Sequence, residues 1–324
     1  MSSKVFKKAG IGAAFLAIVL LSSGRSFAYD RRSSYSLSRS IMGGYYEKLG
    51  DIDKALDQYR NAVAVDRQNA YLHLSLAAAY IKKNEVDKAT AELTLASKLE
   101  PEAVEPHAVL ALLYFTQNKP EDAGREYGAA LEKAVLLEPR NAVIYKNLAA
   151  LYMERGDLAG AERAYKTAID LVPTDHEAHF FLAHVYAGRK NKAEELRSLR
   201  KAIELKPDYH PALNYLGYTL VEDNTNLDEA GRLLEKAVAL DPNNGAYIDS
   251  RGWLRFRQGR FKEALSDLEN ASKLLQDPVI YDHLGDVYAR LKDPAKARAN
   301  WEKSLELDDK QESVRGKLDA LKIK

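Results

Sequence analysis

The chain has 324 residues, with 48 lysines and arginines, 47 aspartates and glutamates, and no cysteine. A near-neutral, evenly mixed charge argues against a nucleic-acid-binding protein. The lack of cysteine excludes disulfides, thiol catalysis and a lipid-modified cysteine, so stability must come from packing.

Residues 1–28 have the three-part composition of a secretory signal peptide. Three lysines precede the apolar run Ile11–Leu21, and a polar stretch ends at the small residue Ala28. The run is too short for a bilayer span, which needs about 20 residues. We expect cleavage after Ala28 and a soluble periplasmic protein. An uncleaved segment that anchors the chain in the inner membrane is the alternative. Cleavage would change the formal net charge from +1 to −3, because the segment holds four basic residues and no acidic one.

Residues 29–35 are predicted to be a short polar linker. They are too few to cover Ile41, Met42 and Tyr45 in the segment that follows. We therefore regard this N-terminal edge as a candidate contact with another protein or with another copy of the chain, which would make a homo-oligomer. The alternative is that the tail folds over the edge.

Small residues then recur at a nearly constant spacing. The first series, spaced by 33 to 38 residues, comprises Gly43, Ala77, Ala111, Ala149, Ala183, Gly217, Gly252 and Gly285. The second series follows twelve or thirteen residues after the first and comprises Ala55, Ala89, Ala123, Ala161, Ala230, Ala264 and Ala297. Small side chains let antiparallel helices approach closely where they cross. The pattern predicts a repeating unit of two helices.

Tyrosines follow the first series by three residues in most copies, and prolines stop the second helix at Pro101, Pro139, Pro173, Pro207 and Pro242. This pattern resembles the tetratricopeptide repeat family. The resemblance covers eight repeats, at residues 36–69, 70–103, 104–141, 142–175, 176–209, 210–244, 245–277 and 278–311. It implies an all-α fold, a right-handed superhelix (α-solenoid) whose first helices line a concave groove.

Residues 312–324 break the repeat. They keep Val314, Leu318 and Leu321 at helical spacing, with charged residues between them. This pattern predicts a C-terminal capping helix whose apolar stripe covers the last repeat.

No catalytic motif is present: the chain lacks a glycine-rich phosphate loop and a metalloprotease His-Glu-x-x-His motif. The nearest metal-site pattern is His176 and His179, with His184 added. The spacing of the first two and the bulky repeat position of His179 favour packing. A weak zinc site, or a metal-dependent enzyme that a chelator would disable, is the alternative. We expect no enzymatic activity, no cofactor and no metal.

The groove positions that the resemblance implies carry several aromatic and charged residues. These are Phe180, His184, Tyr218, Trp253, Phe256, Arg257, Asp282 and Asp286. Aromatic and arginine side chains dominate interface energies, and an extended peptide or a helix with apolar anchors and some positive charge would suit this set. Packing of the rings against the neighbouring repeat is the alternative. The family's carboxylate clamp is disfavoured, because Ala150 and Phe181 replace two of its asparagines.

Three residues depart from the repeat pattern: Glu195 replaces a small residue, and Arg251 and Arg255 replace larger apolar or aromatic ones. A buried charge is costly unless it is paired. Either the arginine stems lie on apolar surface with their heads in water or on acids, or this region is shaped for a ligand.

The segments Leu213–Leu220, Asp249–Trp253 and Asp282–Asp286 resemble the closing repeats of exported bacterial adaptor proteins. Some of these relatives deliver substrates to envelope proteases or act in polysaccharide export. We expect a non-catalytic scaffold or adaptor of the bacterial cell envelope that binds another protein or a peptide in its groove. A membrane-anchored assembly subunit and a glycan-binding accessory of polysaccharide export are the alternatives.

Overall fold

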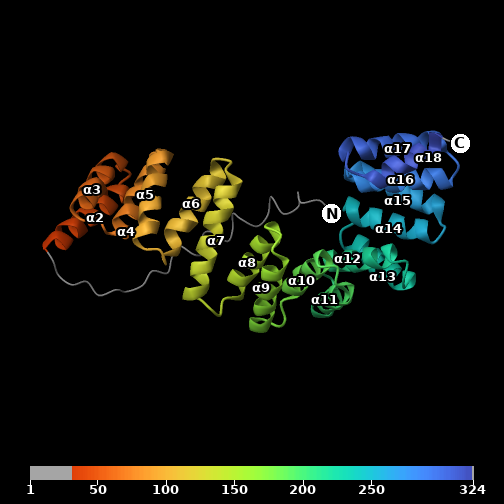
Figure 1. Ribbon diagram of the computed structural model, residues 1–324, viewed down its shortest axis with the longest axis horizontal. Helices are drawn as coiled ribbons and strands as arrows, with labels where there is room; N and C mark the ends of the chain where they lie inside the picture. The colour runs from red at the N-terminus through yellow and green to blue at the C-terminus, as the bar shows by residue number, and fades with distance from the viewer. Residues whose placement is uncertain (1–30, 323–324) are drawn as a thin grey trace. The chain divides into compact units, whose positions relative to one another are not determined.

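The computed structural model describes residues 31–322, which contain seventeen α-helices and no strand. This confirms the predicted all-α fold of stacked helix pairs (Figure 1). The helices form two compact units, one within residues 1–157 and the other within residues 158–324. The predicted signal peptide, residues 1–28, and its cleavage site lie outside the described residues.

Unit 1 contains α2 to α8. Their bounds are Arg31–Lys48 (α2), Ile52–Val65 (α3), Ala70–Lys82 (α4), Val86–Leu99 (α5), Val104–Thr116 (α6), Pro120–Leu137 (α7) and Ala142–Glu154 (α8). The four extra residues of the third repeat lengthen α7 to 18 residues, whereas α5 has 14. The insertion is therefore absorbed as about one additional helical turn.

Unit 2 contains α9 to α18. Their bounds are Leu158–Leu171 (α9), His176–Gly188 (α10), Lys192–Leu205 (α11), His210–Glu222 (α12), Leu227–Leu240 (α13), Gly245–Arg257 (α14), Phe261–Leu274 (α15), Pro278–Arg290 (α16), Pro294–Leu307 (α17) and Glu312–Lys322 (α18). Because the first helix of a repeat is followed by an antiparallel second helix, α10, α12, α14 and α16 are the first helices of this unit.

The glycines of the first series lie where the two helices of a repeat cross. A Cβ atom built on Gly43 would lie 2.6 Å from the Tyr59 ring, and one built on Gly217 would lie 2.6 Å from Leu234 Cγ. Gly285 faces the ring of Trp301 in the same way. Contacts this short do not occur in folded proteins, so glycine at these crossings lets a large side chain of the second helix pack against the first helix.

Helix α2 begins at Arg31, so residues 31–35 are helical and the predicted linker over residues 29–35 is wrong for that part. The repeat pattern starts at Ser36 and carries no signal for helical residues before it. Ser36 and Ser40 are buried on α2, which packs mainly against α3. Ile41, Met42 and Tyr45 are exposed on α2.

Helix α18 covers the last repeat as predicted for a capping helix. Val314 is fully buried and Leu318 is 9% exposed, and both belong to the same apolar cluster as Tyr288 and Trp301. The charged residues of α18 mostly face water, but Lys317 does not, as described below. In residues 31–322 no helix is both long and apolar enough to cross a bilayer.

Candidate functional site

The eight residues predicted to line a groove in unit 2 lie on the first helices α10, α12, α14 and α16. We call this set the aromatic–acidic face. It comprises Phe180, His184, Tyr218, Trp253, Phe256, Arg257, Asp282 and Asp286. On α10, α14 and α16 each of these residues lies three or four positions from another member of the set, so they share one side of the helix. Their burial differs, and the difference separates residues that pack from residues that a partner could reach.

Trp253 lies between two aromatic rings and is almost buried. Its ring stacks on Phe256 with centroids 4.6 Å apart and on His283 with centroids 4.0 Å apart. The indole Nε1 donates a hydrogen bond to Glu222 Oε1 at 2.7 Å. Only 9% of the residue is exposed. Trp253 therefore packs neighbouring repeats together and holds Phe256 in place, which is the packing alternative considered from the sequence.

Phe180 and His184 belong to an aromatic cluster that joins α10 to α12. Phe180 is buried and meets His184 edge-on with centroids 4.7 Å apart, and His184 stacks on Tyr215 at 4.5 Å. Burial lowers the pKa of His184 to about 4, so its imidazole is neutral at pH 7. The cluster is an apolar patch rather than a charged one.

Tyr218, Phe256 and Arg257 are half-buried and so keep part of their surface in contact with solvent. Phe256 is held by Trp253 on one side and by Phe261, whose centroid is 5.5 Å away. Burial raises the pKa of Tyr218, and neighbouring carboxylates raise it further. These three side chains therefore remain partly accessible beside the packed rings.

Asp282 and Asp286, one turn apart on α16, are both paired with a residue of the capping helix. Lys317 Nζ lies 2.6 Å from Asp282 Oδ1 and 2.8 Å from the Asp286 carboxylate. Burial raises the pKa of Asp286, and the Lys317 ammonium partly offsets this. Repeat positions alone gave no sign of this lysine, because it lies outside the repeat pattern. The two carboxylates therefore already share the Lys317 ammonium in the folded chain.

A buried histidine and aspartate connect α14 with α16 below the rings. His283 Nδ1 lies 2.8 Å from Asp249 Oδ1, and both residues are almost fully buried. Burial alone would lower the pKa of His283, but the Asp249 carboxylate, with Asp282 and Asp286 farther off, outweighs it and raises this pKa. Protonated His283 would therefore be held as an ion pair under the Trp253 ring.

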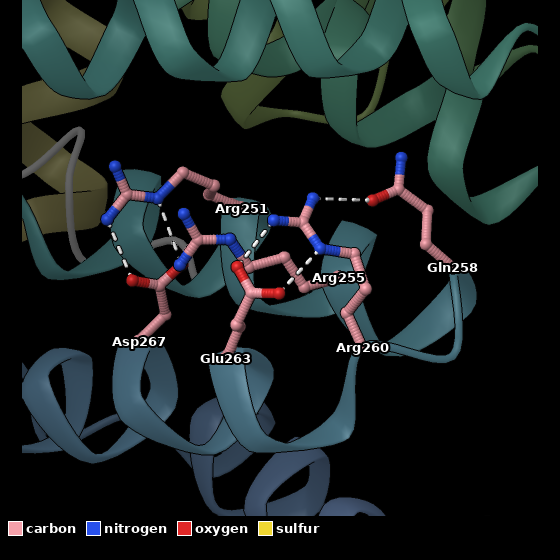
Figure 2. A network of polar contacts seen from close by, with 6 residues as sticks. All are labelled: Arg251, Arg255, Gln258, Arg260, Glu263 and Asp267. Carbon is pink, nitrogen blue, oxygen red and sulfur yellow. Dashed lines mark hydrogen bonds and ion pairs between the residues drawn. The ribbon is translucent and has the colours of Figure 1, made fainter.

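The two arginines that depart from the repeat pattern share one buried carboxylate. Figure 2 shows Arg251 and Arg255, from α14, converging on Asp267 of α15. Arg251 Nε and Nη2 donate to the two Asp267 oxygens at 2.9 and 2.7 Å, and Arg255 Nη1 donates at 2.6 Å. Arg260, Glu263 and Gln258 form a second, exposed set of contacts beside them. The arginine heads are thus paired with an acid, one of the two accounts considered above.

Glu195, the third departure, is 5% exposed at the start of α11. Lys192 Nζ lies 3.5 Å from its carboxylate. The carboxylate also contributes, after burial, to the raised pKa of the Tyr215 hydroxyl. Glu195 is therefore compensated by a cation at the surface and by the tyrosine of the next repeat.

The histidines of the nearest metal-site pattern have separate partners. His176 meets Tyr209 edge-on, His184 stacks on Tyr215, and His179 Nε2 lies 3.3 Å from the Pro173 carbonyl oxygen. The equivalent Tyr145 also donates to a carbonyl six residues before it, that of Pro139. His179 thus has the packing contact of its repeat position. Across residues 31–322 no three histidine or acidic residues are grouped to hold a metal ion.

Sequence reasoning missed an apolar face in unit 1. Large apolar side chains are exposed there on the first helices α2, α4, α6 and α8: Leu37, Tyr71, Leu112, Phe115 and Val143. Tyr71, for example, is 63% exposed. Leu112 and Phe115 occupy the ninth and twelfth positions of their repeat, as Trp253 and Phe256 do, so a count of these positions would have found them. The other three occupy the second position, where the aromatic–acidic face has no residue.

Two relatives share part of the sequence. The TPR repeat-containing protein PA4667 of Pseudomonas aeruginosa is 40% identical over 74 residues, 23% of this chain and 12% of that protein. The Type IV pilus assembly protein PilF of the same organism is 35% identical over 82 residues, 24% of this chain and 32% of that protein. The matches thus cover less than two thirds of either relative.

A solved structure and family models extend the comparison. The crystal structure of the APC/C hetero-tetramer Cut9-Hcn1 aligns with a TM-score of 0.58 and 19% identity, over 83% of this chain and 52% of that chain, which shows a shared fold. A Tetratricopeptide repeat model matches residues 108–175, 146–210 and 250–312, and a TPR repeat model matches residues 45–84. These matches cover more than half of the sequence. The chain therefore belongs to the tetratricopeptide repeat family.

Proposed function

We propose that this protein is a non-catalytic scaffold of the bacterial cell envelope that binds a peptide or helix of another protein on the aromatic–acidic face of unit 2. One observation carries the proposal: half-buried Tyr218 and Phe256 present ring surface beside Arg257 and the acids of α16. Rings fixed by packing lose little conformational entropy on binding, which is what hot-spot residues require.

The family and one relative support a binding function. Proteins built from such repeats bind other proteins, and a relative that matches 24% of this chain is by name a pilus assembly protein. The envelope location rests on the composition of residues 1–28. Mass spectrometry of the mature protein should find Tyr29 at its N-terminus. An intact Met1 in the membrane fraction would instead support an anchored assembly subunit.

A selection experiment tests the binding face. Random peptides displayed on phage are selected on the full chain, and the recovered peptides are measured against Phe256→Ala. Because truncating a central anchor costs about 2 kcal/mol or more, affinity should fall at least tenfold. Tyr71→Ala, which removes an exposed ring in unit 1, is the matched control and should leave affinity unchanged. Peptides that lose affinity with Tyr71→Ala and not with Phe256→Ala would move the binding site to unit 1.

The exposed face of α2 supports a contact between copies as a second proposal. Ile41, Met42 and Tyr45 are exposed on the first helix, and such contiguous apolar surface often marks an interface. Analytical ultracentrifugation of Ile41→Glu against the unchanged chain tests it. A dimer in both samples, or a monomer in both, contradicts an interface at α2.

A further inference from the structure

Rings of consecutive first helices stack on one another in unit 2. His184 on α10 stacks on Tyr215 of α12 with centroids 4.5 Å apart, and Trp253 on α14 stacks on His283 of α16 at 4.0 Å. In both cases the ninth residue of one repeat contacts the sixth residue of the next. The ring at the sixth position therefore covers the ring before it.

The pattern breaks between α12 and α14. Tyr218 is the ninth residue of its repeat, but the sixth residue of the next repeat is Ser250, which has no ring. Within residues 31–322 Tyr218 stacks on no aromatic ring. The Ser250 hydroxyl donates to the Ala246 carbonyl of its own helix at 2.9 Å. Serine thus leaves one side of Tyr218 without the planar partner that His184 and Trp253 have.

The lack of a ring at Ser250 also coincides with a buried oxygen that has no partner. Asn214 lies one turn before Tyr218 on α12, is 3% exposed, and its Oδ1 accepts no hydrogen bond among the described residues. Its equivalent in the next repeat, Asp249, has its Oδ1 on His283, the sixth residue of the repeat after it. A buried acceptor without a donor costs about 1–3 kcal/mol. A ring with a donor at position 250 would have satisfied both Asn214 and Tyr218.

The surroundings of Tyr218 are acidic. The carboxylates of Glu222, Asp249, Asp282 and Asp277 all act on its hydroxyl. Two of them have cationic partners: Lys317 is shared by Asp282 and Asp286, and His283 pairs with Asp249. Even with both partners charged, the acids outnumber the cations. A positively charged group would be favoured beside Tyr218.

We propose that the site formed by Asn214, Tyr218 and Ser250 receives the guanidinium of an arginine from the bound partner. A guanidinium is planar and stacks on an aromatic ring, it has several N–H donors for the Asn214 oxygen, and it is always charged. Lysine offers no plane to stack, and an aromatic side chain offers no charge. This assignment rests on the proposed function, because it specifies one anchor of the same partner.

A small-molecule titration tests the site without any partner. N-acetyl-arginine amide is titrated into the full chain and followed by the indole N–H resonances of its two tryptophans, Trp253 and Trp301. The Trp253 resonance should shift with saturation while that of Trp301, buried under α18, stays in place. The matched probes are N-acetyl-citrulline amide, of nearly equal shape without charge, and N-acetyl-lysine amide. Each should bind at least tenfold more weakly. Equal binding of the three probes, or no shift, overturns the proposal.

Variants at Ser250 provide the second arm. Ser250→His copies the His283 arrangement, so it should fill the site, bond Asn214 and abolish the arginine-dependent shift without lowering Tm. Ser250→Tyr copies Tyr215 and should do the same if the histidine variant fails to fold. Unchanged arginine binding in a folded variant refutes the site.

The peptide selection distinguishes this inference from the function on which it rests. Selected peptides should contain an arginine whose change to lysine lowers affinity at least tenfold in the unchanged chain and has no such effect in Ser250→His. Peptides that depend on Phe256 but not on an arginine would preserve the binding function and refute the arginine site. If no peptide is recovered, the proposed function fails, and the titration still decides the site.

Discussion

Asp267 offers the sharpest test of how unit 2 tolerates its two extra arginines. Changing Asp267→Asn removes the charge that Arg251 and Arg255 share and weakens three hydrogen bonds of 2.6 to 2.9 Å. Breaking a fully buried ion pair costs about 3–5 kcal/mol. Because the arginine side chains are 23% and 21% exposed and can turn partly to water, we expect a loss of about 2–3 kcal/mol.

The assay is urea unfolding followed by circular dichroism, with hydrogen exchange on α14 and α15 to locate the loss, because repeat arrays need not unfold in one step. The control is the triple change Arg251→Leu, Arg255→Leu and Asp267→Leu. It installs the leucines that the preceding repeat carries at equivalent positions: Leu216, Leu220 and Leu233. Replacing the whole network with apolar residues should be neutral or stabilising. A loss below about 0.5 kcal/mol for Asp267→Asn would refute this reasoning.

Three further outcomes follow from the packing. Gly217→Ala should destabilise the chain by about 1–3 kcal/mol in a urea titration, because the added methyl group forces Leu234 aside. Gly316→Ala should stabilise it by up to about 1 kcal/mol, because a Cβ atom there has no other atom within 4 Å. Equal effects of the two changes would contradict the crossing geometry. The pKa of His184 is lowered to about 4, so between about pH 6.5 and 4 its imidazole is protonated in the unfolded chain but not in the folded one, and stability falls as pH drops through this range. His184→Phe should remove up to about 3 kcal/mol of this pH dependence, and an unchanged pH profile of stability would contradict the burial of His184 as its cause. Truncation before Glu312 should expose Trp301 and lower Tm or cause aggregation, and a truncated chain that stays monomeric with the same Tm would show that α18 is dispensable.

The helix pairs could be predicted because close packing restricts size at fixed positions. Gly43 faces Tyr59, and Gly285 faces Trp301, so a small residue on the first helix recurs with a large one on the second. The start of α2 could not be predicted in the same way. Helix α2 begins at Arg31, before the first repeat starts at Ser36, and a helix that extends beyond its repeat leaves no periodic mark in the sequence.

The sequence predicted which residues belong to the aromatic–acidic face, but not which of them are buried by neighbouring side chains. Repeat position places Trp253 and Phe256 on the same side of α14, yet it does not say that His283, 30 residues away, covers one ring and not the other. The pairing of Lys317 with Asp282 was missed for a related reason. Contacts made by individual side chains between helices depend on the particular residues of each repeat, which an average pattern does not contain.

Both tryptophans lie in unit 2, and this has a spectroscopic consequence. Tryptophan emission excited at long wavelength reports on unit 2 alone, so unfolding of residues 31–157 leaves it unchanged unless tyrosine is also excited. Trp253 stacks on His283, whereas Trp301 lies under Lys317 in the last repeat. A protonated imidazole quenches a stacked indole, so the emission of Trp253 should brighten as pH rises through the raised pKa of His283. A fluorescence melt therefore describes half of this chain and needs a tyrosine or circular-dichroism signal for the other half.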